Sequence, residues 1–170
     1  MSELNRIDVD EFKKTDKTPL VIILDNVRSA LNVGSAFRTS DAFLVEKIYL
    51  TGITAKPPHK EIKKSALGAT ESVAWEYVES TVDLVRRLQT QGYQVIPVEQ
   101  VSSSTSLENF QPLQNEKYAF VFGNEVFGVK DEVVEMVEQC IEIPQFGTKH
   151  SLNISVSLGV VIWDFFTKIR

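Results

Sequence analysis

The apolar positions of the chain form short β-branched runs that alternate with segments of helical spacing. A run of this kind that ends in polar or glycine residues is typical of a buried strand. The strands predicted in this way share a central apolar run and lie at 19–27, 46–52, 71–78, 93–100, 117–124 and 140–144.

Between these runs, apolar residues recur every three to four positions, which predicts helices at 32–44, 81–92 and 131–139. Gly92 stands where a helix commonly ends. Strands that alternate with helices predict an α/β fold, with a mostly parallel sheet and helices on both faces. We predict one such domain over 19–170. Residues 1–18 are polar and charged, and we expect this extension to have little order.

The tail at 151–169 fits two patterns. Leu152, Ile154, Val156 and Leu158 alternate as in a strand, whereas Leu152, Val156 and Val160 also recur at helical spacing. Its length favours a helix. Because such a helix is apolar on several faces, it must be covered on several sides, by the domain itself or by another subunit.

Composition narrows the functional classes. A chain of 170 residues with 43% hydrophobic and 24% charged residues is typical of one globular domain. No apolar run is long enough to span a membrane, and the N-terminus lacks the features of a signal peptide. The single cysteine, Cys140, suits a reducing cytoplasm and is expected to be buried and inert. His59 and His150 are far apart, so no metal site is expected.

Charge is segregated along the chain, although the net value is only −5. Acidic residues gather at 125–142, and basic ones at 56–64, where Lys56, His59, Lys60, Lys63 and Lys64 are accompanied by a single acid. The simpler interpretation of this basic cluster is a solvated helix face. The alternative is a contact surface for nucleic acid.

Three polar loops follow predicted strands, where open α/β sheets bind their ligands. The first carries Asn32, a plausible helix N-cap, then Gly34 and, one turn further on, Arg38. The second is FGNEVFGV at 122–129, and the third is IPQFGTKHSLNIS at 143–155. Each loop also has a structural explanation, such as a turn, a cap at Ser151 or a surface arginine. The glycine signatures of dinucleotide-binding and P-loop proteins are missing.

The order of these loops resembles the three motifs of the SpoU (TrmH-like) group of knotted SPOUT RNA 2′-O-ribose methyltransferases. Residues 24–43 resemble the first motif, 122–129 the second and 143–165 the third, so that the likeness extends over about 20–166. Departures are mild: Gln145 stands where methionine is common, and Ser157, Leu158 and Gly159 replace an alanine-rich stretch.

The resemblance implies a C-terminal trefoil knot that binds S-adenosylmethionine, and a homodimer formed partly through the last helix. The cofactor residues implied are Gly123, Asn124, Gly128, Ile143, Pro144, Ser151 and Leu152. Gly123 would let the cofactor approach the backbone. The catalytic residues implied are Arg38, Asn32, Glu125, Ser151 and Asn153.

RNA is the partner that the resemblance implies, with tRNA favoured over rRNA, and Lys60, Lys63, Lys64 and Arg38 are expected to contact it. Because a guanidinium holds its proton strongly, Arg38 is expected to bind a phosphate rather than to act as a free base. Two alternatives remain: a catalytically silent RNA-binding relative, and a dinucleotide-binding oxidoreductase, which the missing glycine signature disfavours.

Overall fold

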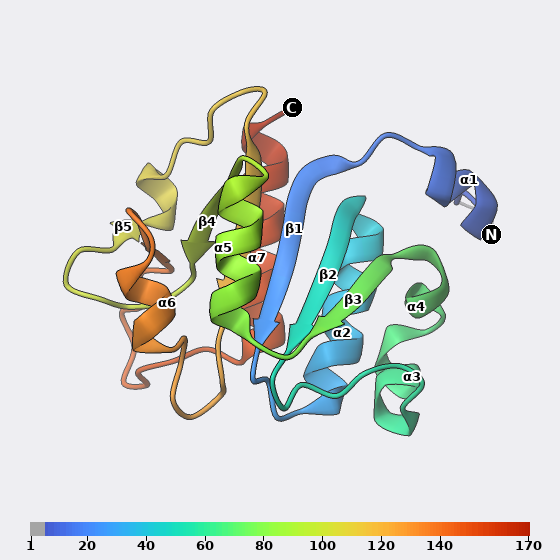
Figure 1. Ribbon diagram of the computed structural model, residues 1–170, viewed down its shortest axis with the longest axis horizontal. Coiled ribbons are helices and arrows are strands. Elements are labelled where there is room, and N and C mark those ends of the chain that lie inside the picture. The colour runs from blue at the N-terminus through green and yellow to red at the C-terminus, as the bar shows by residue number, and fades with distance from the viewer. Residues whose placement is uncertain (1–5) are drawn as a thin grey trace.

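The computed structural model describes residues 6–170 and has five parallel strands at its centre (Figure 1). Their order across the sheet is β3-β2-β1-β6-β4. The strands and helices, in chain order, are α1 Val9–Lys14, β1 Thr18–Asp25, α2 Ala30–Ala42, β2 Val45–Thr51, α3 Lys60–Ala66, α4 Ala69–Ser72, β3 Ala74–Val78, α5 Thr81–Thr90, β4 Tyr93–Pro97, β5 Thr105–Ser106, a 3₁₀ turn at Leu107–Asn109, β6 Lys117–Phe122, α6 Asp131–Glu135, β7 Ile141–Glu142 and α7 Ile154–Lys168.

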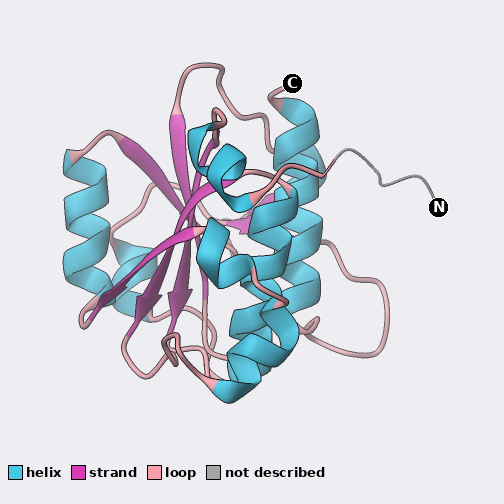
Figure 2. Cartoon of the chain, turned by 90° about the vertical axis from the view of Figure 1, so that its right-hand side faces the viewer, coloured by secondary structure: helices cyan, strands magenta, loops and turns pink. Residues whose placement is uncertain are grey.

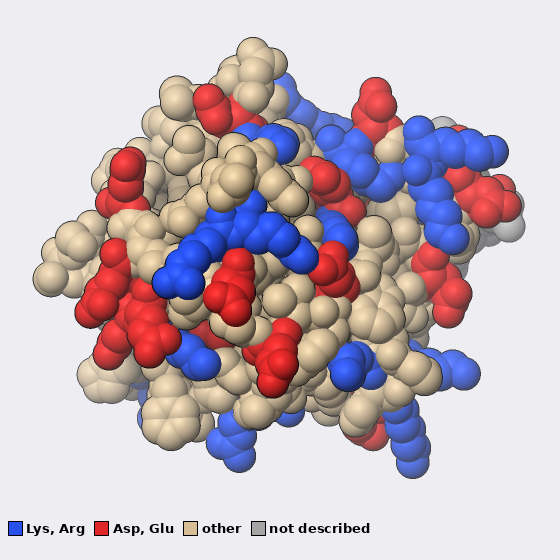
Figure 3. All heavy atoms as spheres, viewed as in Figure 1, with Lys and Arg blue, Asp and Glu red and all other residues tan. Residues whose placement is uncertain are grey.

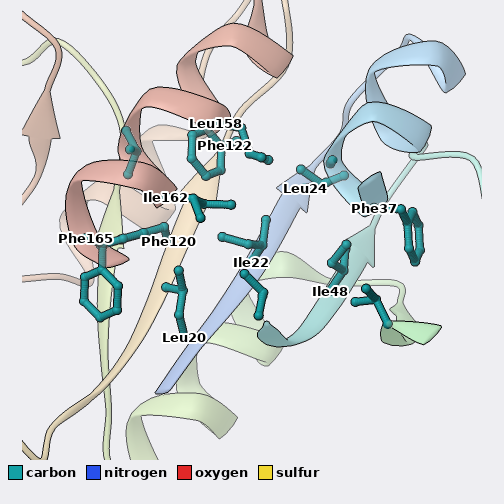
Figure 4. Close-up of a cluster of buried hydrophobic side chains, with 14 of the residues drawn as sticks. Leu20, Ile22, Leu24, Phe37, Ile48, Phe120, Phe122, Leu158, Ile162 and Phe165 are labelled. Carbon is teal, nitrogen blue, oxygen red and sulfur yellow. The ribbon is translucent and has the colours of Figure 1, made fainter. Parts of the chain in front are cut away.

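Helices cover both faces of the sheet, as predicted (Figure 2). In β1, Leu20, Ile22 and Leu24 point to the side of α2 and α7, whereas Val21 and Ile23 point to the side of α5 and α6. Figure 4 shows the first of these layers, in which side chains of β1, β2 and β6 meet those of α2 and α7. This alternation follows from the two-residue period of a strand.

β1 and β6 are neighbours although the residues that they pair are 98 positions apart in the chain, with Leu20 opposite Tyr118 and Leu24 opposite Phe122. The loops that leave these two strands therefore start side by side. β1 also pairs with β2 on its other side. From β1 the chain continues outward through β2 and β3 on one side of the sheet, whereas β6 and β4 lie on the other side. Such a divergence is where open α/β sheets bind ligands.

Three local predictions were wrong. The described part of the N-terminal extension, 6–18, is ordered, because α1 forms and Phe12 is only 3% exposed, whereas 1–5 lie outside the described residues. The segment 140–144 does not join the main sheet, since β7 has two residues and pairs with β5 in a separate two-stranded sheet. The helix predicted over 131–139 ends at Glu135.

The tail is a helix, α7, and covers β1 and β6 through Leu158, Ile162 and Phe165. Its threading through a loop as a trefoil knot stays a prediction. No helix within residues 6–170 combines the length and the apolar character that a membrane span requires.

Candidate active site

A cavity of about 590 Å³ lies at the carboxyl ends of β4 and β6 and against the start of α7. Three loops build it. Its lining residues are Val98, Glu99, Gln100, Phe122, Gly123, Asn124, Glu125, Val126, Phe127, Gly128, Glu142, Ile143, Gln145, His150, Ser151, Leu152, Asn153, Ile154 and Ser157. The structure thus brings the second and third motifs together.

The second motif forms a tight loop held by its own hydrogen bonds. The backbone N–H groups of Asn124 and Gly128 each donate to the other's carbonyl oxygen, at 3.0 and 2.9 Å. The Asn124 Oδ1 accepts from the N–H groups of Val126 and Phe127, and its Nδ2 donates to the Asn26 carbonyl at 2.8 Å. Asn124 therefore shapes the loop and fastens it to the loop that follows β1.

Gly123 is required by this loop itself. A Cβ on Gly123 would lie 2.2 Å from the carbonyl carbon of Gly128 and from the backbone nitrogen of Val129. We expected Gly123 to permit close approach of a cofactor, but its first constraint is the backbone that lies across it. Gly128 has φ +68°, which favours glycine, and the Glu99 Oε2 accepts from the adjacent Val129 N–H at 2.9 Å.

Glu125 connects the second motif to the first. Its carboxylate accepts from the backbone N–H groups of Arg28 and Ser29 at 2.8 and 2.9 Å, and from the Asn32 Nδ2 at 3.2 Å. Burial alone would raise the pKa of Glu125, but these hydrogen bonds outweigh it and lower the pKa below its usual value. At neutral pH the group is a carboxylate that holds the start of α2.

The first motif differs in detail from the prediction. Ser29 is the N-cap of α2, and its hydroxyl accepts from the Asn32 N–H at 3.2 Å, so that Asn32 lies in the first turn. Gly34 allows close approach of another helix rather than of a ligand, because a Cβ there would lie 2.4 Å from the Ile62 carbonyl of α3.

Arg38 is exposed on α2 and is not among the residues that line the cavity. Its side chain forms no hydrogen bond or ion pair with any residue of 6–170. The structure therefore does not bring Arg38 to Gly123 and Leu152 within one chain. Its catalytic role stays a prediction.

In the third motif, Asn153 rather than Ser151 caps α7, with Oδ1 accepting from the Ser155 N–H at 2.8 Å. Ser151 is exposed and lines the cavity without a partner among the described residues. Pro144 is the one predicted cofactor residue that does not line it.

Sequence reasoning missed the loop after β4. Val98, Glu99 and Gln100 line the cavity, and the Glu99 N–H donates to the Ile141 carbonyl at 2.9 Å. The rule that ligands bind at the carboxyl ends of strands could have found them, since the strand at 93–100 was predicted.

The chemistry of the lining fits an adenosine-containing cofactor. Within residues 6–170, the backbone N–H and C=O groups of Ile143 and Leu152 have no hydrogen-bond partner, and both residues line the cavity. Free main-chain donors and acceptors beside apolar side chains suit an adenine edge and a ribose. Within residues 6–170, no three His, Cys, Asp or Glu residues form a group that could hold a metal ion.

The basic cluster lies elsewhere. Lys60, Lys63 and Lys64 are exposed on α3. Figure 3 shows basic side chains projecting over α3 at the lower right, whereas acidic ones gather over α6 at the left. The charge segregation predicted from the sequence is confirmed. Cys140 is buried, and burial followed by the charge of Glu99 raises the pKa of its thiol, which agrees with an inert cysteine.

Comparison with known proteins gives the family. The model of the SpoU rRNA methylase family matches residues 19–163. The chain belongs to this family. A 23S rRNA (guanosine-2′-O-)-methyltransferase, RlmB, of Vibrio parahaemolyticus is 29% identical over 162 residues, which are 95% of this chain and 64% of the relative. A tRNA (guanosine(18)-2′-O)-methyltransferase of Aquifex aeolicus is 31% identical over 152 residues, covering 85% of this chain and 67% of that protein.

Solved structures agree. The crystal structure of the A. aeolicus TrmH/SpoU tRNA modifying enzyme has a TM-score of 0.81 at 26% identity and covers 94% of this chain and 79% of that one. An AdoMet-bound rRNA methyltransferase from Sinorhizobium meliloti has the same fold, with a TM-score of 0.83 at 23% identity over 94% of this chain and 60% of that one. The chain thus spans a little under two thirds of the length of several relatives that it matches.

Proposed function

We propose that this SpoU-family protein transfers a methyl group from S-adenosylmethionine to a ribose 2′-hydroxyl of RNA. The observation that carries the proposal is the cavity in which the second and third motifs meet, lined by Ile143 and Leu152, whose main-chain groups have no hydrogen-bond partner among residues 6–170. The named relatives methylate guanosine ribose in 23S rRNA or in tRNA, so a guanosine ribose is the first substrate to test.

The cofactor, when bound, supplies an already activated methyl group, so the protein's task is to place the ribose oxygen in line and to assist loss of its proton. Ser151 and Asn153, at the rim of the cavity, would position the ribose. Glu125 acts through the loop that it fastens, and we assign it a positioning role. Arg38 would bind a neighbouring phosphate with two hydrogen bonds, and its charge would lower the pKa of the hydroxyl.

We infer a homodimer through α7. Val156, Val160 and Trp163 follow one another at helical spacing and are 51%, 40% and 55% exposed, which makes an apolar stripe on a helix that otherwise covers the core. The α2 helix lies beside α7, and the Phe43 ring is 5.7 Å from the Trp163 ring. A second copy seated on this stripe would also meet α2, which carries Arg38. We assign the protein to the cytoplasm, where RNA substrates and reduced cysteine occur together.

The test uses the purified protein, radiolabelled S-adenosylmethionine, and unmodified tRNA or rRNA, followed by mass spectrometry of the nucleosides. We expect 2′-O-methylated nucleosides; base-methylated nucleosides, or cofactor binding without transfer, would contradict the proposal. Arg38→Lys keeps the charge but cannot bind a phosphate with two parallel hydrogen bonds, and should reduce the transfer rate at least tenfold. Near-full activity of this variant would refute the phosphate-binding role.

A further inference from the structure

A second cavity, of about 700 Å³, lies between α3, α4 and the edge strand β3. It shares no lining residue with the cavity at Gly123 and Leu152. Lys60 and Lys63 of α3, Glu71 of α4 and Trp75 of β3 line it. Its volume falls in the range of small-molecule sites.

One wall of this cavity is cationic. Lys60 and Lys63 are one helical turn apart and both line the cavity, and both are exposed. Neither forms an ion pair with any residue of the described chain, 6–170. His59 also lines it, and its Nδ1 accepts from the Glu61 N–H at 3.1 Å, which leaves Nε2 for a ligand. Ammonium groups without a protein carboxylate suit a phosphate.

The lining of the cavity also has an aromatic part, which β3 supplies. Trp75 is half-buried on the edge strand, and its indole N–H donates to no group between residues 6 and 170. Tyr77, two residues on and thus on the same face of β3, has the Lys56 Nζ 4.2 Å from its ring centre. An indole and ammonium groups that line one cavity match a nucleobase with its phosphate, because a base stacks on an aromatic ring whatever its identity.

The cavity also offers polar groups for the edge of a base. Thr70 and Glu71 line it, and neither side chain has a hydrogen-bond partner within 6–170. A carboxylate accepts from the exocyclic amino groups of adenine, cytosine and guanine and from the ring N–H groups of guanine and uracil. Stacking and edge contacts together distinguish a nucleotide from a simple anion.

The helix that carries the lysines is fixed to the first motif. The Ser65 hydroxyl of α3 donates to the Leu31 carbonyl of α2 at 2.8 Å, and Gly34 lets the two helices touch. The first turn of α2 is in turn held by Glu125 through Asn32. Figure 1 shows α3 and the start of α2 near the same end of the sheet. The second cavity is thus held in a fixed position relative to the candidate active site.

We propose that this second cavity binds one unstacked nucleotide of the substrate RNA, other than the nucleotide that is methylated, with its base on Trp75 and its phosphate at Lys60 and Lys63. The proposal rests on the proposed function, since it concerns the same RNA. According to this proposal, lysines of the basic cluster bind a phosphate inside a defined pocket, and do not only attract phosphates through their charge.

The experiment uses Trp163→Phe, in which Trp75 is the only tryptophan, saturated with S-adenosylhomocysteine so that the first cavity is filled. Titration with a short single-stranded RNA should quench the indole emission saturably, and the same backbone with abasic riboses should not. Trp75→Leu keeps apolar bulk but removes the aromatic face, and should weaken RNA binding roughly 5- to 100-fold. Trp75→Phe should retain most of the affinity.

Unchanged RNA affinity in Trp75→Leu, with unaltered melting temperature and S-adenosylhomocysteine binding, would overturn the inference, as would the absence of quenching by RNA. Saturation by free GMP or AMP as tightly as by RNA would overturn it too, since the ligand would then be a free nucleotide. Methyl transfer to RNA without quenching refutes only this inference, whereas quenching by RNA without transfer refutes only the proposed function.

Discussion

Glu125 offers the sharpest test of how the candidate active site is held together. Its carboxylate accepts three hydrogen bonds from the start of α2 and the residues before it. A hydrogen bond to a charged group contributes about 1.5–3 kcal/mol where it is well shielded. Glu125 is exposed, so water replaces much of what is lost. We therefore expect Glu125→Ala to lower the free energy of unfolding by about 1–2 kcal/mol in total.

For a chain of this length, that loss corresponds to a fall in melting temperature of about 2–8 °C. If the cofactor binds only when these hydrogen bonds hold the loop in place, the variant must lose the same free energy in binding. Its affinity for S-adenosylhomocysteine should then be roughly 5- to 30-fold lower than that of the wild type. Glu125→Gln keeps one acceptor oxygen but loses the charge, and should fall between the alanine variant and the wild type. Differential scanning calorimetry and titration calorimetry measure the two quantities.

Glu138→Ala is the matched control, because Glu138 is exposed and accepts no hydrogen bond within the described chain. If Glu125→Ala behaves like this control in both measurements, the three hydrogen bonds do not hold the site and the reasoning fails. The pH dependence supplies a second check. Because the pKa of Glu125 is lowered in the folded protein, its stabilisation is complete above the ordinary value of about 4.3 and is lost as the pH falls through the lowered value.

Three further predictions concern the loop, the basic cluster and α7. Gly123→Ala should cost about 1–3 kcal/mol and abolish tight cofactor binding, because the new Cβ would meet backbone at 2.2 Å. Neutralising Lys63 and Lys64 together should reduce the slope of log affinity for single-stranded RNA against log salt by about 1.4. Val160→Glu should convert the proposed dimer to a monomer in sedimentation experiments, since it puts a charge in the apolar stripe.

Each of these has a matched control in the chain. Gly147→Ala should change neither stability nor binding, as nothing lies within 4 Å of its added Cβ. Lys13 and Lys14, exposed on α1, should leave the salt slope nearly unchanged when neutralised. Leu113→Glu introduces the same charge at a residue that is 66% exposed outside α7, and should leave the association state as it is.

The strands and most helices could be predicted because their signals are local. Val21 and Ile23 alternate with Leu20, Ile22 and Leu24, and both faces of β1 are buried, so a continuous apolar run identified the strand. Pairing is different: nothing in the residues of β6 says that it lies beside β1 rather than beside β4 alone. The small β5–β7 sheet was missed because two-residue strands carry no periodic signal.

Helix starts were ambiguous for a chemical reason. Ser29 and Asn32 are both favoured N-cap residues, three positions apart, and either could begin the helix. The contact that decides between them is the hydrogen bond of Asn32 to Glu125, 93 residues away. Ser151 and Asn153 pose the same problem at α7, where the Asn153 carboxamide takes the cap.

The glycines of FGNEVFGV illustrate how a motif can be recognised correctly for an incomplete reason. Gly123 was expected to make room for a ligand, yet the nearest obstacle to a side chain there is the backbone of Gly128. Gly128 in turn faces the carboxylate of Glu99, which would lie 2.2 Å from an added Cβ and which accepts from the Val129 N–H. Since Glu99 also donates its N–H to Ile141, one residue fastens the loop of the second motif to the segment that opens the third. The walls of the cavity are therefore joined by hydrogen bonds of one residue's side chain and main chain, which would spare a bound cofactor the conformational entropy of ordering them.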